Sequence, residues 1–117
     1  MNNLLQLLAN QCTDATEARL EYRSVPADQI ISGNPRVGTA ELGQLGQVSI
    51  GVWEMSPSVT TDVEVDEFFI VLSGRATVAF ADGSPELQLK PGTVGHLSAG
   101  TATIWSVTET LRKVYVA

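Results

Sequence analysis

The sequence predicts a single all-β domain, a sandwich or barrel built from short strands. After residue 25, turn-forming Gly, Pro, Asn and Ser residues recur every few positions, and short runs rich in β-branched and aromatic residues lie between them. Short strands at close spacing with Gly and Pro at the turns are typical of sandwiches and barrels. No helical pattern of ten or more residues intervenes, which excludes a parallel sheet made of alternating strands and helices.

Seven runs are the predicted strands. In chain order they are Gln47–Trp53, Phe68–Leu72, Arg75–Ala81, Leu87–Leu89, Val94–Leu97, Thr103–Val107 and Lys113–Val116. Between them, Asp82-Gly83 suits a hairpin and Lys90-Pro91-Gly92 suits a type II turn, because Gly accepts a positive φ. Ser73-Gly74 is predicted to be a further turn that separates two strands.

Length, composition and charge bound the possible functions. The chain has 117 residues, of which 44% are hydrophobic and 17% are charged. A chain of this size buries roughly two-thirds of its unfolded surface, which is enough for a core without disulfides. The 7 basic and 13 acidic residues give a net charge of −6, which argues against a nucleic-acid partner and against an anionic membrane surface.

Residues 1–24 are predicted to be a leader, followed by the main domain at residues 25–117. Leucines near the start predict a short amphipathic helix capped by Asn2 or Asn3; they are Leu4, Leu5, Leu7 and Leu8. The leader lacks the basic start and long apolar stretch of a signal peptide, and no window is long enough for a membrane span. Cys12 is the single cysteine, so a cytoplasmic protein without an intrachain disulfide is expected.

The acidic run at residues 62–67 is the first candidate for chemistry. Strand alternation puts Glu67 on the apolar face that carries Phe69 and Val71. Glu67 is therefore directed toward an interior where loss of water penalises its charge. The other acids of the run share the opposite face: Asp62, Glu64 and Asp66. The alternative is that all four acids form a solvated loop and strand edge.

The single histidine and the two tryptophans are the next candidates. His96 lies in a predicted strand and cannot alone make a histidine-rich metal site, so a structural and a ligand-binding role both stay open. Trp53 and Trp105 are predicted in strands, either as core residues or as surfaces on which a ligand stacks. The sequence has no Gly-rich phosphate loop, nucleophile elbow or zinc-binding Cys pair.

Seven segments occur in an order and spacing that together are specific. They are Ile31–Pro35, Gly51–Glu54, Glu67–Arg75, Leu89–Gly92, Ala99-Gly100, Trp105 and Arg112–Val116. From about Val25 to Val116 the chain thereby resembles the cupin superfamily, and within it the small ureidoglycine-aminohydrolase-like or ethanolamine-utilisation-Q-like cupins. The resemblance implies a double-stranded β-helix, that is, a jelly-roll cupin barrel, which is usually dimeric.

The resemblance also implies a metal site, of which this chain keeps one ligand. In the first cupin motif, G-x5-H-x-H-x3-4-E-x6-G, the acid falls on Glu67 and the last glycine on Gly74. The three histidine positions of the two cupin motifs fall on Thr61 and Val63 (or Thr60 and Asp62) and on Thr103. A transition metal needs at least three good protein ligands, so no metal and no cofactor is predicted.

Three functions follow as hypotheses. The first is a metal-free barrel that binds a small polar metabolite through residues at its mouth: Glu67, Glu54, Trp53, Trp105, His96, Thr103, Lys113 and Tyr115. The second is a metal-free isomerase- or epimerase-type enzyme with Glu67 or Glu54 as general acid or base, or with His96 beside Tyr22 or Tyr115. The third is a weak metal-dependent enzyme resembling ureidoglycine aminohydrolase.

Two expectations accompany these hypotheses. A homodimer is expected, because the leucines of the leader and the sheet edges of a small barrel need cover. No cation is expected to neutralise Glu67, which is expected to serve ligand binding rather than folding. Glu67→Gln should therefore be neutral or stabilising at pH 7 and should abolish ligand binding. If Glu67 has a cationic partner, Lys113 is the first candidate for it.

Overall fold

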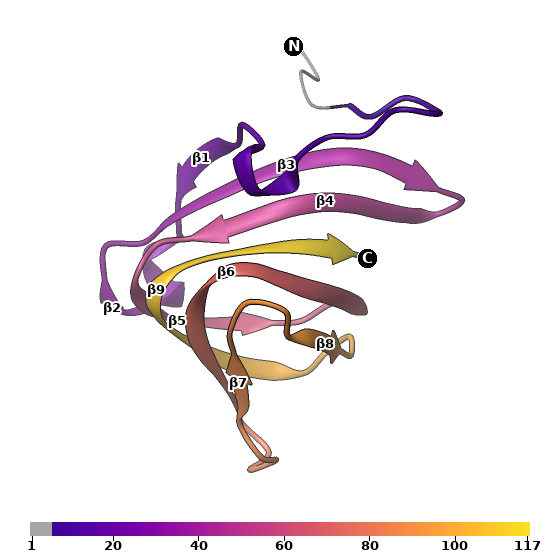
Figure 1. The fold of residues 1–117 in the computed structure, drawn as a ribbon. Coiled ribbons are helices and arrows are strands. Elements are labelled where there is room, and N and C mark those ends of the chain that lie inside the picture. Colours follow the sequence, from indigo (N-terminus) through magenta and orange to yellow (C-terminus); the bar gives the residue numbers. More distant parts are fainter. Residues whose placement is uncertain (1–5) are drawn as a thin grey trace.

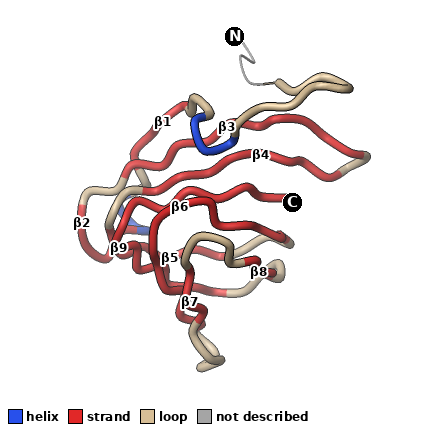
Figure 2. The backbone as a smooth tube through the Cα atoms, in the orientation of Figure 1, coloured by secondary structure: helices blue, strands red, loops and turns tan. Residues whose placement is uncertain are grey.

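A computed structural model describes residues 6–117, and these form one curled, almost entirely β-stranded body (Figures 1 and 2). The strands are β1 (Glu21–Ser24), β2 (Ile30–Gly33), β3 (Arg36–Leu45), β4 (Val48–Met55), β5 (Ser58–Val63), β6 (Glu67–Phe80), β7 (Leu87–Leu89), β8 (Val94–Leu97) and β9 (Ala102–Val116). Two single turns of 3-10 helix, η1 (Ala15–Glu17) and η2 (Ala27–Gln29), accompany them. The predicted all-β barrel class is confirmed.

Strand β9 is the centre of the sheet. Its first half pairs antiparallel with β5 and its second half with β4, while β6 pairs with β9 along both halves. The strand order β1-β3-β4-β9-β5-β2 continues from this centre, and β7 and β8 pair with β6. Because β9 changes neighbour along its length, the sheet curls on itself and encloses one concave side (Figure 1).

The turn predicted at Ser73-Gly74 is wrong, because β6 continues through it as a bent strand. Gly74 has φ +92°, and the register between β6 and β9 shifts on either side of it. A Cβ at this glycine would collide with the backbone of Thr110 on β9. Glycine here permits a bulge and a close backbone approach instead of a chain reversal. The last two predicted strands are likewise one strand, β9.

Four strands were not predicted from the sequence: β1, β2, β3 and β5. Strand β3 contains Gly38 and Gly43, which look like turn signals. Gly38 instead lies under the ring of Tyr22, where a Cβ would come within 2.6 Å of a ring carbon. The other predicted turns are confirmed, since Gly83 and Gly92 have φ of +83° and +93°. The Thr93 N–H donates to the Lys90 carbonyl at 3.0 Å, which closes the second turn.

Apolar side chains pack on both faces of the sheet. The concave face holds the larger cluster, made of Val37, Met55, Phe69, Val71, Ala76, Val78, Leu89, Leu97, Trp105, Val107 and Leu111. The convex face holds a smaller one, made of Ala18, Leu20, Leu42 and Val52, with Leu7 packed against it. The alternation of β4 explains this division, because Val52 faces outward and Trp53 faces inward.

The N-terminal segment covers the convex face as extended chain rather than as the predicted leucine helix. The Leu7 N–H donates to the Leu42 carbonyl at 2.7 Å, and neither Leu7 nor Leu8 is helical. The helical turn comes later, at η1, where the Asp14 side chain accepts a hydrogen bond from the Thr16 N–H. Leu4, Leu5 and the capping residues Asn2 and Asn3 lie outside the described residues. Within residues 6–117, no helix has the length and apolar character that a membrane crossing requires.

Candidate functional site

The concave side of the sheet contains a cavity of about 380 Å³. Its wall comes from β3, β4, β5, β6 and β9, and the segment from Arg23 to Gln29 closes part of it. The size is within the range of small-molecule sites. Five of the predicted site residues line this cavity: Trp53, Glu67, Trp105, Lys113 and Tyr115.

An ion pair lies inside the cavity wall. Lys113 Nζ is 2.7 Å from Glu67 Oε2, and the two side chains are only 5% and 12% exposed. The ammonium also lies 4.6 Å from the ring centre of Trp53 and 4.7 Å from those of Phe69 and Trp105. Three aromatic faces and one carboxylate therefore hold this cation in place. The expectation that no cation neutralises Glu67 is wrong, because Lys113 is paired with it.

A second carboxylate, Glu64, is buried beside the pair. Its Oε2 accepts hydrogen bonds from Thr103 Oγ1 at 2.6 Å and from Trp105 Nε1 at 2.9 Å. The expectation that Glu64 lies on the face opposite Glu67 is wrong. Asp62 and Glu64 keep the alternation of β5 and both line the cavity, but residues 64–66 are not strand, so the alternation does not carry over to Glu67 in β6. Thr103 is buried and supports Glu64, and its side chain is not part of the cavity lining.

Two further residues at the cavity, Asp62 and Tyr115, have raised pKa values. Loss of surrounding water raises the pKa of Asp62 above its usual value, and the nearby charge of Glu64 adds to this effect. Loss of water also raises the pKa of the Tyr115 hydroxyl, with smaller contributions from the charges of Glu41 and Glu67. Both groups line the cavity together with Lys113 and Glu67.

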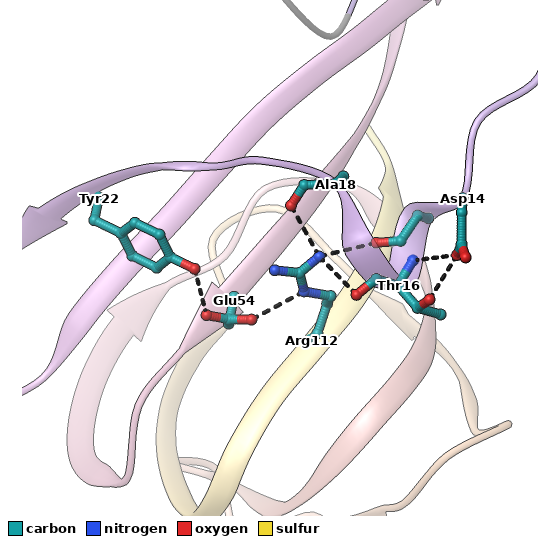
Figure 3. Close-up of polar contacts among 7 residues, drawn as sticks. Asp14, Thr16, Ala18, Tyr22, Glu54 and Arg112 are labelled. Carbon is teal, nitrogen blue, oxygen red and sulfur yellow. Dashed lines mark hydrogen bonds and ion pairs between the residues drawn. The ribbon is translucent and has the colours of Figure 1, made fainter.

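Glu54, predicted as a catalytic residue, lies outside the cavity on the convex face. Its carboxylate accepts hydrogen bonds from Arg112 Nε at 2.9 Å and from the Tyr22 hydroxyl at 2.7 Å (Figure 3). Arg112 Nη1 also donates to the carbonyls of Ala15, Thr16 and Ala18, at 3.0 to 3.1 Å. These contacts fasten the N-terminal segment to the sheet, so the geometry assigns Glu54 a structural role. Trp53 and Glu54 were predicted to lie together at the mouth of the barrel. This is wrong because neighbouring residues of β4 face opposite sides of the sheet.

His96 is also outside the cavity. It lies on the exposed face of β8, where its ring stacks on Phe68 with a centroid distance of 4.2 Å and an angle of 3° between the planes. A His–Tyr pair for acid–base chemistry is therefore not formed, because Tyr22 bonds Glu54 and Tyr115 lines the cavity. The opposite face of β8 is occupied by Leu97 and by Gly95, which packs on the ring of Phe69.

The residues present do not fit the transition metal that cupin barrels usually hold. Glu67 is bonded to Lys113, and the Thr103 hydroxyl is bonded to Glu64. The Thr60 hydroxyl contacts the Met55 sulfur at 3.9 Å. Within residues 6–117, no three His, Cys, Asp or Glu side chains are grouped so that they could hold a metal ion.

Asp62 and Glu64 in the cavity and Arg112 on the convex face were not among the residues predicted to bind a ligand. A signal for Arg112 was present. Two adjacent cations, Arg112-Lys113, interrupt the otherwise apolar stretch of residues 111–116, and each needs a separate acid on its own side of the sheet.

A curled antiparallel barrel with a polar cavity on its concave side is the architecture of a small cupin. The chain belongs to the family of EutQ-like cupin domains, whose model matches residues 42–115. No curated protein matches the sequence of this chain.

Solved structures agree with this assignment. A protein of unknown function from Pseudomonas syringae pv. tomato superposes with a TM-score of 0.76 at 23% identity, over 88% of this chain and 45% of the other. This chain therefore spans less than half of that protein. A protein of unknown function from Rhizobium leguminosarum is 31% identical over 68% of this chain and 78% of its own, with a TM-score of 0.61. A putative ethanolamine utilization protein Q from Salmonella typhimurium shares the fold at 18% identity and a TM-score of 0.62, over 85% and 94% of the two chains.

Proposed function

We propose that this protein is a metal-independent cupin that binds a small polar molecule in its barrel cavity. The observation that carries the proposal is the Lys113–Glu67 pair, whose charged atoms meet 2.7 Å apart in the wall of the cavity. A concave site lined by aromatic side chains and a few convergent polar groups is the usual form of a small-molecule site. Trp53 and Trp105 supply the aromatic wall, and Asp62 adds a further polar group.

The size of the cavity limits the ligand. A volume of about 380 Å³ corresponds to roughly a dozen water molecules at ~30 Å³ each. The ligand is therefore a compact metabolite with on the order of ten non-hydrogen atoms.

The signals of the two tryptophans allow ligand binding to be tested with an unlabelled ligand. Trp53 and Trp105 are the only tryptophans of the chain, and both line the cavity. A panel of small polar metabolites should contain compounds that change the indole N–H signals in ¹H–¹⁵N spectra, and Lys113→Met should weaken these effects. Arg75→Ala, a change on the exposed surface, should leave them unaltered. A broad panel in which no compound shifts either indole signal would contradict the proposal.

A second function, acid–base catalysis in the same cavity, is favoured by Asp62. A carboxyl group in a cavity wall whose pKa is raised by desolvation and by a neighbouring charge is a candidate general acid or base. In this version Asp62, rather than Glu54 or His96, moves the proton, and Lys113 holds the substrate. Turnover that is lost in Asp62→Asn while binding of the same compound persists would support catalysis, whereas binding without turnover would leave the protein a binding module.

Association and compartment complete the proposal. We propose a homodimer, supported by exposed apolar side chains on neighbouring strands of the outer surface: Phe68, Ile70 and Val94. Exposed apolar groups that lie together on a sheet favour contact with another protein surface. We also propose a cytoplasmic location, supported by the free, exposed Cys12.

A further inference from the structure

We propose that the Lys113 ammonium is the positive centre of this barrel in place of a metal ion, and that it binds a carboxylate oxygen of the ligand. This inference rests on the proposed function, because it names the chemical class that the same cavity takes. The aromatic rings then hold the ammonium in place, and Glu67 is the carboxylate of the chain whose charge competes with that of the ligand.

The hydrogen bonds of Lys113 leave it able to bind a ligand. An ammonium has three N–H donors, and within residues 6–117 Nζ bonds one acceptor, Glu67 Oε2. Its other contacts are ring faces, which attract the charge without removing a donor from the cavity side. A ligand oxygen can therefore be added to the ammonium while the bond to Glu67 is kept.

The surroundings strengthen such a bond. Lys113 is nearly buried, and its side chain ends among Trp53, Phe69 and Trp105, so little water competes for its charge. Charge-assisted hydrogen bonds in a water-poor site are stronger than those at the surface. Because the ammonium is already held in position, binding costs little side-chain entropy.

The same geometry disfavours an amine as the group that binds at this point. Aromatic faces that could receive a cationic ligand already receive the Lys113 ammonium. A ligand ammonium placed there would repel Lys113 and would compete with it for Glu67. Donor groups of the ligand have a separate place, at Asp62 on the cavity wall.

Three probes of similar size and different charge test the inference: acetate, acetamide and ethylamine. Each is titrated into ¹⁵N-labelled wild-type protein, and the indole signals of Trp53 and Trp105 are followed. Acetate should shift them with millimolar affinity, and acetamide and ethylamine should bind at least tenfold more weakly. Lys113→Met should lower the acetate affinity tenfold or more.

Glu67→Gln gives the sharper result, because the two roles of Glu67 predict opposite outcomes. If the ammonium binds the probe, removal of the competing carboxylate charge should raise the acetate affinity severalfold. If Lys113 and Glu67 only stabilise the fold, Glu67→Gln should leave the affinity unchanged or lower it. Glu109→Gln, which removes an equal charge from the exposed surface, is the matched control and should have no effect.

The possible failures are distinguishable. Shifts caused by ethylamine and not by acetate would overturn the carboxylate assignment and would leave the proposed binding function intact. If Lys113→Met does not fold, an unchanged or reduced acetate affinity in folded Glu67→Gln would overturn the inference by itself. A third failure is that none of the three probes shifts the indole signals, while larger metabolites shift them by the same amount in wild type and in Glu67→Gln. In that case the ammonium is not the group that binds the ligand.

Discussion

Arg112 and Lys113 are consecutive in β9, yet their charged groups lie on opposite sides of one sheet, each bonded to its own acid. Arg112 Nε reaches Glu54 Oε1 at 2.9 Å on the convex side, and Lys113 Nζ reaches Glu67 Oε2 at 2.7 Å on the concave side. Both cations also oppose β4 in register, Arg112 across from Glu54 and Lys113 across from Trp53. Arg112 therefore attaches the N-terminal segment on one side of the sheet, and the adjacent Lys113 belongs to the candidate ligand site on the other side.

The first prediction concerns this attachment. Arg112→Met should destabilise the protein by about 3 kcal/mol, because it leaves the partly buried Glu54 without its cation and three backbone carbonyls without their donor. Urea unfolding measures the loss. Limited proteolysis should then cut within residues 8–20 first.

A matched control for Arg112 is available on the surface. Arg75→Met breaks an ion pair with Glu109 in which both side chains are more than half exposed. Exposed pairs contribute little, so a change of about 0.5 kcal/mol or less is expected. Equal losses in the two variants would contradict the structural role of Arg112.

The second prediction revises the expectation that Glu67→Gln is neutral or stabilising at pH 7. Because Glu67 neutralises the nearly buried Lys113, the substitution should cost about 2 kcal/mol at neutral pH. The double variant Glu67→Gln/Lys113→Met should recover part of the loss, since no unpaired charge is left. A double-mutant cycle measures the coupling, and strictly additive losses would show that the pair contributes no net stability.

The third prediction is a pH dependence that arises from Asp62. Desolvation, reinforced by Glu64, raises its pKa in the folded protein, so the folded state binds the proton more tightly than the unfolded chain. This contribution to stability is complete at low pH and is lost as pH rises through the raised pKa. Asp62→Asn should therefore be more stable than wild type at pH 7 and equal to it near pH 3, as measured by urea unfolding at both pH values.

Asp82 provides a control of opposite sign. Hydrogen bonds from Ser84 lower the pKa of Asp82, so its contribution is present at neutral pH and is lost as pH falls. Asp82→Asn should be less stable than wild type at pH 7, and the difference should vanish at low pH. The same direction in both variants would show that Asp62 is not desolvated.

The fourth prediction is the metal content. Purified, untagged protein should carry no stoichiometric Mn, Fe, Ni, Cu or Zn, because Glu67 is engaged by Lys113 and threonines stand at histidine positions of the cupin motifs. Elemental analysis is the measurement. One bound metal ion per chain that disappears in Glu67→Ala would refute it.

The fifth prediction is a homodimer in solution. Sedimentation should give about twice 12.5 kDa, and Ile70→Lys or Val94→Lys should shift the protein toward a monomer, because both side chains are exposed on adjacent strands. A matched change at another exposed site, Leu45→Lys, should leave association unaltered. A monomer at tens of micromolar would exclude the proposed dimer.

The side of the sheet that each candidate residue faces could be predicted for the inner residues and not for Glu54, for a physical reason. Glu67, Trp53, Trp105, Lys113 and Tyr115 lie in strands whose alternation is regular, so their inward direction follows from parity. Glu54 has the opposite parity to Trp53, and that single step in the chain moves it to the convex face. Strand parity was applied to Glu67 and not to Glu54.

The remaining errors arose where regular structure ends or bends. Residues 64–66 between β5 and β6 are not strand, so alternation does not carry over from Glu64 to Glu67. Gly38 and Gly74 look like turn residues, although one accommodates the Tyr22 ring and the other permits a bulge. The sequence does not distinguish a glycine that permits a close approach from a glycine at a turn. The difference depends on which residue elsewhere in the chain lies against it.

The central position of β9 has a consequence for biosynthesis. β4, β5 and β6 are all made before the strand that joins them, and each has one edge that stays unpaired until residues 102–116 leave the ribosome. Pairing partners so distant in sequence make folding slow, and open strand edges invite aggregation. The nascent chain is therefore most vulnerable just before its β9 segment emerges, and holding factors that bind exposed strands would act in that interval.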